Sequence, residues 1–274
     1  MIIISNKPGQ LGNLLFVYAN VLAYGLENNI KILNPAFYNY LSYFEGTQKH
    51  SKLVYKLFYF TSYYIARIIC KLNLKSAFVY AKSITWEEVV DLDIPNQLPN
   101  KLCFVQGWLY RGDKLLLKHK ESIKKHFTPT LKLSTEIDGF MSANFNVNQE
   151  IIIALHIRRG DYKTFKNGMY YYSINDYKNI MDNIKNVFVT KNIHFLICSN
   201  EKIEINELNK NNNKITLAPN HPLLDMYCMT RCNYIVGPPS TYTMWASFYG
   251  NVPLYMVEDK DRIVTISDFK LQFQ

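Results

Sequence analysis

Two adjacent arginines carry the most specific chemical signal in this sequence. Arg158 and Arg159 stand in the motif HIRRGDY, which overlaps the end of the apolar run IIIALHI at residues 151–157. Neighbouring guanidinium groups repel each other unless an anion lies beside them, and guanidinium forms paired hydrogen bonds with phosphate oxygens. Asp161 can neutralise one arginine in a structural salt bridge, but a single carboxylate cannot fully serve two guanidinium groups. The pattern therefore predicts a phosphate-bearing ligand, and a diphosphate would satisfy both side chains.

Three further polar residues stand at the start of predicted helices. Ser240 and Thr241 follow a short apolar run and two prolines, so either hydroxyl can cap the next helix or bind phosphate at its N-terminus. Asp225 stands early in another predicted helix, where it can interact with the helix dipole or hydrogen-bond a base or ribose. The residue types leave both alternatives open at each position.

A glycine loop near the start of the chain is a weaker signal. The segment KPGQLGN at residues 7–13 places Gly9 and Gly12 between an apolar run and a helical pattern. Such a loop lets backbone N–H groups approach a ligand, but it lacks the Lys-Ser/Thr of a P-loop and the GxGxxG spacing. A tight structural turn is the alternative, and Asn13 is the polar group that could reach a ligand.

No pattern in the sequence predicts a metal site. His221, Cys228 and Cys232 lie close together in the sequence, but neither CxxC nor HExxH is present, so we expect three buried residues of one helix face. The five cysteines are odd in number and stand mostly in apolar runs, which favours reduced, buried thiols over disulfides.

The elements that must position these residues alternate regularly in the second half of the chain. Apolar runs and helical patterns follow one another, which is typical of a parallel, doubly wound sheet with ligands at the carboxyl ends of its strands. HIRRGDY stands at such an end. The predicted strands are 151–157, 194–200, 214–219, 234–237 and 253–257, and the predicted helices lie near 175–189, 202–210, 223–231 and through Trp245 to Gly250.

The first half begins with a predicted strand at 2–4, the glycine loop, an amphipathic helix and a second strand at 31–35. Residues 36–100 are aromatic without a clean period and receive no assignment, except that 57–70 reads as a core or acceptor-groove helix, with peripheral membrane contact as the alternative. We infer an α/β protein of two Rossmann-like domains facing a cleft, with the boundary at residue 150.

Composition and charge narrow the function classes. With 48% hydrophobic and 19% charged residues, the chain cannot be disordered or fibrous. The net charge of +9 fits an anionic partner without choosing among a phosphorylated metabolite, a nucleic acid and an acidic membrane surface. The apolar start MIII is too short for a signal peptide, and no window of ~20 apolar residues could span a bilayer. We expect a cytoplasmic protein, with the inner face of the membrane as the place of any lipid contact.

Four segments, in order, resemble the inverting α-1,2-fucosyltransferases of glycosyltransferase family 11. They are GQLGNLLFVYANVLAYGLEN, QGWLYRGDKLLLKHKESIKKHF, HIRRGDY and LLDMYCMTRCNYIVGPPSTYTMWASFYG. The resemblance implies a GT-B-like fold, GDP-fucose as donor, and no metal ion or other cofactor. The closing motif departs from the family, which usually has a serine-rich stretch with paired tryptophans there, and CSNE stands where an Asp pair is common.

The resemblance also implies residue roles. Arg158 would hold the β-phosphate of the donor and stabilise the leaving GDP, and Asn13 would lie near the reacting centre. Arg159 and Asp161 would support the loop. The residues that would contact the nucleotide and its phosphates are His156, Asp225, Ser240 and Thr241. The general base stays unassigned.

The function expected from this resemblance is transfer of L-fucose to a galactoside hydroxyl with inversion, in surface glycan or O-antigen synthesis. The acceptor would be an oligosaccharide or a lipid-linked glycan. The first domain, 1–150, would hold the acceptor, and the second, 151–274, the donor. The alternatives are a transferase for another nucleotide sugar and a basic protein that binds nucleic acid or membrane. The absence of an RNP motif or a dense basic stripe argues against nucleic acid as the partner.

Overall fold

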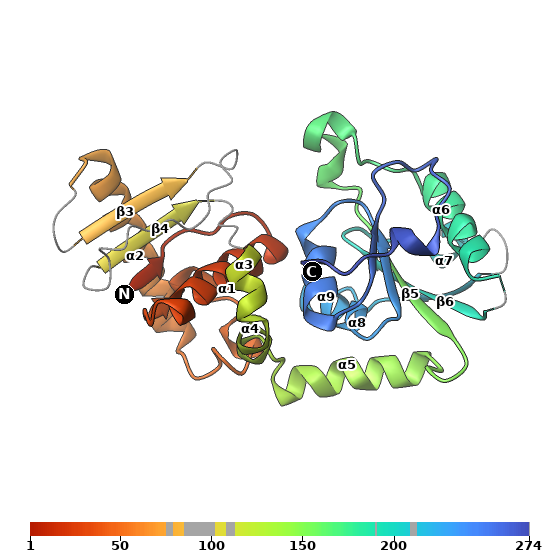
Figure 1. The fold of residues 1–274 in the computed structure, drawn as a ribbon, viewed down its shortest axis with the longest axis horizontal. Coiled ribbons are helices and arrows are strands. Elements are labelled where there is room, and N and C mark those ends of the chain that lie inside the picture. Colours follow the sequence, from red (N-terminus) through yellow and green to blue (C-terminus); the bar gives the residue numbers. More distant parts are fainter. Residues whose placement is uncertain (75–78, 85–101, 108–112, 190, 209–212, 274) are drawn as a thin grey trace. The chain divides into compact units, whose positions relative to one another are not determined.

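The computed structural model describes residues 1–74, 79–84, 102–107, 113–189, 191–208 and 213–273. The chain divides into two compact units, Met1–Leu133 and Ser134–Gln274, each built on its own parallel sheet (Figure 1). The α/β class predicted from the sequence is therefore confirmed. Among the described residues, no helix has the length and apolar character needed to cross a membrane.

The sheet of the first unit has four parallel strands in the order β2-β1-β4-β3. The predicted opening of strand, glycine loop, helix and strand is confirmed. Local pattern does not predict β3 and β4, because short apolar runs are ambiguous between a strand and a buried helix segment. The strands are β1 (Ile2–Ile4), β2 (Ile32–Leu33), β3 (Val79–Ile84) and β4 (Leu102–Gly107).

Helices and an aromatic cluster complete the first unit. The rings of Phe37 and Phe44 stack at 5.8 Å, and Phe127 packs edge-on against Phe44 at 5.6 Å. The segment after residue 35 shows no helical period because it forms two short 3-10 helices around this cluster. The helices are α1 (Leu11–Glu27), η1 (Pro35–Phe37), η2 (Leu41–Tyr43), α2 (Lys52–Lys71), α3 (Asp113–Lys118) and α4 (Lys120–His126).

Helix α2 corrects one expectation. It contains the aromatic stretch 57–70, but only one of its faces belongs to a core. Ser62 and Ala66 are fully buried on that face, and Ala66 packs with Ile3 and Phe104 of the sheet. The interpretation as a core helix is therefore wrong for the opposite face, which remains exposed.

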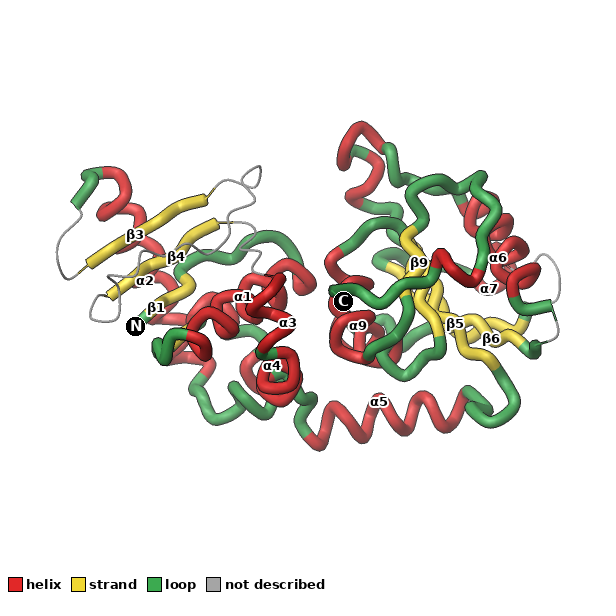
Figure 2. Tube along the Cα trace, in the orientation of Figure 1, coloured by secondary structure: helices red, strands yellow, loops and turns green. Residues whose placement is uncertain are grey.

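The sheet of the second unit has five parallel strands in the order β7-β6-β5-β8-β9. Every strand and helix predicted for this half is present, with shifts of a few residues at the ends (Figure 2). The strands are β5 (Ile151–Ile157), β6 (Ile193–Ser199), β7 (Lys214–Leu217), β8 (Tyr234–Gly237) and β9 (Leu254–Met256). The helices are α6 (Ile174–Val187), α7 (Ile205–Leu208), α8 (Pro222–Met229) and α9 (Thr241–Gly250), with short 3-10 helices η3 (Asp161–Lys163), η4 (Phe165–Gly168) and η5 (Ile266–Asp268).

The division between the units falls before the predicted boundary at residue 150. Helix α5 (Leu131–Asn144) lies almost entirely in the second unit. Asp138 accepts from Nε of Arg231 at 3.2 Å, and the ring of Phe145 lies 4.3 Å from that of His194 in β6. The strand signal begins only at residue 151, but the helix before it and the residue that follows the helix already contact the second unit.

Candidate functional site

The strand order of the second unit reverses beside β5. The chain passes from β5 to β6 and β7 on one side, and then returns to the other side of β5 as β8 and β9. In open parallel sheets, ligands bind at the carboxyl ends of the strands at such a reversal. The motif HIRRGDY runs from the end of β5 into the loop at this point, as the sequence predicts.

His156 is buried near the end of β5. Its side chain is 3% exposed, and Nδ1 has no hydrogen-bond partner. Burial, together with the charge of Arg158, lowers the pKa of the imidazole to about 3, so the ring is neutral. A Cβ on Gly237, at the end of β8, would lie 2.9 Å from the Cβ of His156, so glycine permits this close approach of the two strands.

Arg158 is anchored in the loop after β5. Its backbone N–H donates to the hydroxyl of Tyr177 at 3.2 Å. Its guanidinium donates twice to Asp161, from Nε to Oδ1 at 3.1 Å and from Nη2 to Oδ2 at 2.7 Å. The guanidinium also lies 5.0 Å from the ring centroid of Tyr162. The arginine side chain is only 12% exposed and the carboxylate 46%, so the carboxylate is the partner nearer to solvent.

The surroundings of Arg159 differ from the expectation that Asp161 is the one carboxylate available to both arginines. Its Nη1 pairs with Glu201 at 3.2 Å, and its Nη2 donates to the hydroxyl of Tyr171 at 3.1 Å. The second arginine thus has a carboxylate of its own, and the premise that Asp161 alone must serve both is wrong. Nε of Arg159 is nevertheless buried without a hydrogen-bond partner.

The partner of Arg159 comes from the segment CSNE, which ends β6 and begins the loop after it. Because β5 and β6 are parallel neighbours, with Ile157 opposite Ser199, the residues that follow each strand lie side by side. Asn200 accepts from the backbone N–H of Arg159 at 3.3 Å, and Glu201 accepts from its side chain. The sequence shows the segment CSNE, but its pairing with Arg159 depends on β6 lying beside β5.

Asp225 is buried in the first turn of α8. Its side chain accepts from the backbone N–H of His221 at 3.1 Å, which is the first-turn role that the sequence left as one alternative. Burial raises the pKa of Asp225 to about 6, and hydrogen bonds from the backbone of the preceding turn offset only part of this effect.

The zinc alternative receives no support from these residues. His221 is the N-cap of α8 and accepts from the backbone N–H of Leu224, so the expectation that it is a buried helix-face residue is wrong. Cys228 and Cys232 are buried and reduced, as expected. No cluster of His, Cys, Asp and Glu within the described ranges has the arrangement of a metal site.

Ser240 and Thr241 open helix α9, which follows β8. Ser240 is the N-cap, and its Oγ accepts from the backbone N–H of Tyr242 at 3.2 Å. Thr241 is the first residue of the helix and is partly exposed. The capping alternative is thus realised by Ser240, at the N-terminus of a helix that begins beside the end of β5.

Tyr242 is a site residue that sequence reasoning missed. Its ring lies 5.1 Å from that of His156, and its hydroxyl donates to the carbonyl of Pro222 at 2.6 Å. It therefore connects the buried histidine of β5 with the start of α8, which holds Asp225. Its position two residues after the capping serine is the only signal that could have indicated it.

Seven of the eight predicted site residues lie at this carboxyl edge of the second sheet. They are His156, Arg158, Arg159, Asp161, Asp225, Ser240 and Thr241. Asn13 belongs to the first unit, where it is the third residue of α1 and partly exposed.

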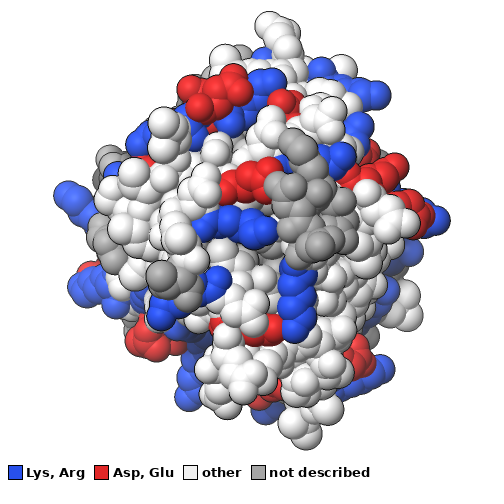
Figure 3. All heavy atoms as spheres, turned by 90° about the vertical axis from the view of Figure 1, so that its right-hand side faces the viewer, with Lys and Arg blue, Asp and Glu red and all other residues white. Residues whose placement is uncertain are grey.

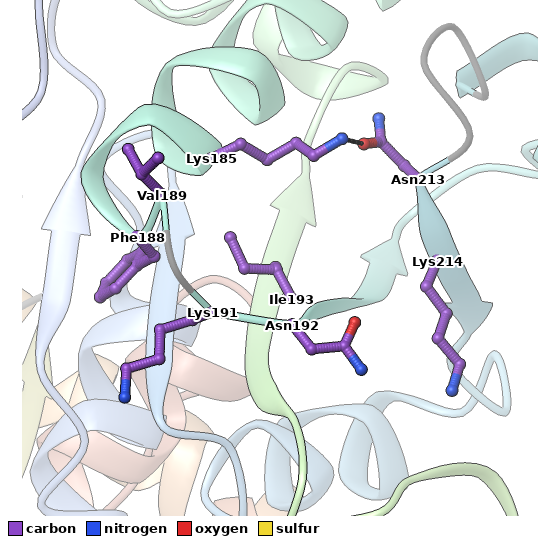
Figure 4. A pocket seen from close by; sticks show the side chains of 8 residues that line it. All are labelled: Lys185, Phe188, Val189, Lys191, Asn192, Ile193, Asn213 and Lys214. Carbon is purple, nitrogen blue, oxygen red and sulfur yellow. Dashed lines mark hydrogen bonds between the residues drawn. The ribbon is translucent and has the colours of Figure 1, made fainter.

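A pocket at the opposite edge of the same sheet contains none of these residues. It lies where β6 and β7 begin and α6 ends, and Lys185 bridges it by donating to Asn213 at 2.6 Å (Figure 4). Lys214 of this pocket pairs with the buried carboxylate of Glu150. Ligands of open parallel sheets bind at the other ends of the strands, so we do not assign the site here.

Comparison with known proteins identifies one family. The chain matches the family model of glycosyl transferase family 11 over residues 114–259, which is more than half of its length and includes the arginine loop, α8 and α9. No curated protein matches the sequence.

Solved structures with a similar fold include three fucosyltransferases. NodZ from Bradyrhizobium is 12% identical with a TM-score of 0.59, over 96% of this chain and 97% of NodZ. Arabidopsis thaliana FUT1, solved with GDP, is 12% identical with a TM-score of 0.61, over 93% and 69%. POFUT1, solved with GDP-fucose, is 13% identical with a TM-score of 0.57, over 90% and 93%. These likenesses show the fold and confirm the expected GT-B-like class.

Proposed function

The chain belongs to glycosyl transferase family 11, and on this premise we propose that it transfers L-fucose from GDP-fucose to a sugar hydroxyl. One observation carries the donor site. Two buried polar atoms, Nδ1 of His156 and Nε of Arg159, have no hydrogen-bond partner at the point where the strand order reverses. A buried polar group without a partner is costly, so a ligand that supplies an acceptor for the Arg159 Nε–H and a hydrogen-bond partner for the imidazole Nδ1 would be bound strongly.

The diphosphate of the donor would lie beside Arg158. Asp161 is the more exposed member of the pair, so phosphate oxygens can take its place on the guanidinium. The N-terminus of α9, with Ser240 and Thr241, offers further phosphate contacts. Asp225 would accept a hydrogen bond from the base or ribose. Fucose as the donated sugar is supported by the solved structures, since POFUT1 and a NodZ described as an α-1,6-fucosyltransferase were solved with GDP-fucose.

The chemical step would be a direct displacement. The acceptor hydroxyl oxygen bonds to C1 of fucose while the bond from C1 to the β-phosphate oxygen breaks, and that electron pair leaves with GDP. Attack from the face opposite the departing phosphate inverts C1, and the hydroxyl proton passes to a general base that stays unassigned. Arg158 would stabilise the growing negative charge on GDP, which is the task that a divalent cation performs in other transferases. We therefore propose a reaction that needs no metal.

The acceptor would contact the first unit. Nζ of Lys7, in the glycine loop after β1, lies 3.5 Å from the ring centroid of Tyr38 and 5.2 Å from that of Tyr59. All three side chains are partly exposed. Aromatic rings of this kind stack on the apolar faces of sugars. Asn13, later in the same loop and helix, would lie near the reacting hydroxyl.

The α-1,2 linkage and the galactoside acceptor rest on the resemblance of the sequence motifs to that subgroup. NodZ shares the fold and is an α-1,6-fucosyltransferase, so the fold does not select the linkage. Incubation with labelled GDP-fucose and an array of glycans, followed by linkage analysis of the product, tests both. A product linked other than α-1,2 to galactose contradicts this part of the proposal and leaves fucosyl transfer intact.

The choice of nucleotide is tested by calorimetric titration with GDP, ADP and UDP. We expect micromolar affinity for GDP alone, unchanged by EDTA. Tight binding of UDP or ADP would favour a transferase for another nucleotide sugar on the same scaffold. Binding of oligonucleotides with a steep dependence on salt would favour the nucleic-acid alternative. The face in Figure 3 intersperses lysine and arginine with aspartate and glutamate and carries no basic stripe.

Substitution of Arg158 tests the catalytic assignment. Arg158→Ala should reduce kcat by about 100-fold or more, because it removes a cation aimed at the leaving group, while the thermal midpoint stays near that of the wild type. Arg158→Lys should recover part of the rate. Arg231→Ala is the matched control, since Arg231 also pairs with an aspartate, Asp138 of α5, but lies in the turn between α8 and β8, before the latter strand begins. Wild-type turnover by Arg158→Ala would refute the assigned role.

A further inference from the structure

Helix α2 of the first unit carries exposed apolar side chains along the face opposite its buried one. Leu57 is 61% exposed and Ile68 is 53% exposed, whereas Ser62 and Ala66 on the packed face are fully buried. The outward side chains recur every three or four residues, so they form one continuous line along the helix. We call this line the apolar stripe; it consists of Leu53, Val54, Leu57, Phe60, Tyr64, Ile65, Ile68 and Leu72.

The stripe is a concentration of apolar surface and not a random scatter. Of the nineteen exposed large apolar side chains among the described residues, nine lie between Leu53 and Leu74. Soluble proteins rarely expose a contiguous apolar patch unless it meets a partner or a membrane. Thr61 lies within the stripe, but its hydroxyl donates to the carbonyl of Phe58 at 3.0 Å, so it can enter an apolar medium with its donor satisfied.

The charged side chains of the segment that carries the stripe all have one sign. Residues 46–74 contain no aspartate or glutamate. The cations of this segment are exposed and are Lys49, Lys52, Lys56, Arg67 and Lys71. Two copies of the chain paired through this face would bring two such sets of cations together with no acid in the segment to offset them, which disfavours a dimer. An anionic lipid surface offers the complementary charge.

We propose that α2 docks the protein on a membrane that contains anionic phospholipid. The helix lies in the plane of the interface, the apolar stripe enters the boundary between headgroups and acyl chains, and the cations bind lipid phosphates. Tyr59 packs beside Tyr38 at 5.8 Å, on the side of α2 away from the stripe. The docking surface is independent of the donor site and needs no bound nucleotide.

Vesicle co-sedimentation of the full chain tests the docking. The probes are vesicles of phosphatidylcholine alone and vesicles that also contain phosphatidylglycerol. We expect the wild type to sediment with the anionic vesicles and to remain mostly in solution with the neutral ones. A stripe variant with Leu57→Gln, Phe60→Gln and Ile68→Gln should bind the anionic vesicles about tenfold or more weakly, since each apolar side chain contributes through its buried area.

A matched control carries the same number of apolar-to-glutamine changes at exposed positions outside α2. Val147→Gln, Val189→Gln and Ile263→Gln should leave vesicle binding at the wild-type level, since these side chains are more exposed than the three that the stripe variant replaces but lie outside α2. A third variant, with Lys52→Gln, Lys56→Gln and Lys71→Gln, should lose the preference for anionic over neutral vesicles. Titration with GDP should be unchanged in all three variants, which separates this test from that of the transferase.

Several results would overturn the docking proposal. The first is that the wild type does not bind anionic vesicles, and the second is that the stripe variant binds them as well as the wild type does. The third is that the wild type binds no vesicles but forms a concentration-dependent dimer, and that the stripe variant does not form this dimer. If the stripe variant does not fold, Phe60→Trp provides a conservative probe. Its added fluorescence should be quenched by brominated lipid, whereas that of Ile263→Trp should not, and lack of quenching at position 60 contradicts the proposal.

Discussion

The buried carboxylate of Asp225 lowers the stability of the folded protein when it is ionised. The folded protein raises the pKa of Asp225 from 3.8 to about 6 because the carboxylate is buried, and the hydrogen bonds from the backbone N–H groups of Asn220 and His221 offset only part of that effect. The folded state therefore holds more protons than the unfolded state between about pH 4 and pH 6, and the free energy of unfolding falls as the pH rises through that window. A destabilising buried carboxylate at the end of a sheet is more typical of a binding site than of a structural element.

Asp225→Asn should remove this pH dependence. The amide keeps an oxygen for the His221 N–H, so the variant should gain about 1–3 kcal/mol relative to the wild type at pH 7.5 and much less at pH 4.5. Urea unfolding at the two pH values measures the difference. A difference that does not change with pH would mean that the carboxyl group titrates normally. We also expect weaker GDP binding by this variant, by calorimetry.

At the scale of elements, the site depends on how closely β5 and β8 approach each other. Gly237 ends β8, and a side chain there would meet the Cβ of His156 at 2.9 Å and its carbonyl oxygen at 3.0 Å. Neither atom can move without shifting the strand. Helix α9 then begins with the Ser240 cap, and Tyr242 connects it to α8. The strand approach thus sets the positions of the helix starts that would face the ligand.

Gly237→Ala should force these strands apart. We expect a loss of about 1–3 kcal/mol in the free energy of unfolding and weaker GDP binding, because His156 moves with the strand. Gly139→Ala is the matched control: it stands inside α5, and apart from its chain neighbours and the backbone of its own helix nothing lies within 4 Å of the new Cβ. This control should be neutral or gain about 0.5–1 kcal/mol. Chemical unfolding and calorimetry measure both effects, and equal stability of the two variants would argue against the close packing.

At the scale of the molecule, two parallel-sheet units divide the work that we propose. All the predicted donor residues belong to the second unit, whereas Asn13 and the apolar stripe of α2 belong to the first. Donor binding and membrane docking should therefore be separable by substitution. The proposed site and the pocket of Figure 4 lie at opposite ends of the strands of one sheet. An experiment that locates bound GDP along the chain can therefore tell which of the two places holds it.

Hydrogen exchange with and without GDP distinguishes the two edges. GDP should slow exchange in the segments that end or follow the strands at the carboxyl edge, because a ligand that binds only the folded site suppresses local opening. The segments are 156–162, 199–201, 221–225 and 237–242. Residues 185–193 at the other edge should be unaffected, and ADP should have no effect. Protection by GDP that is confined to residues 185–193 or to the glycine loop at 7–13 would contradict our assignment of the donor site to the carboxyl edge of the second sheet.

Local patterns in the sequence were sufficient to predict the second sheet, its helices and the arginine loop, because alternation of apolar runs and helical periods is a short-range property. They also indicated which residues stand at strand ends. The order of strands decided the rest. Glu201 reaches Arg159 because β6 lies beside β5, and Tyr242 reaches His156 because β8 lies on the other side.

The two faces of α2 show the same limit. Its residues are apolar almost all round, so the sequence alone determined a helix but not which side would be buried. Only the tertiary structure decided that Ser62 and Ala66 face the sheet and that Leu57 and Ile68 face outward. The physical reason is that burial depends on which surfaces are brought together over long sequence distances, and a residue's own type and its neighbours along the chain do not contain that information.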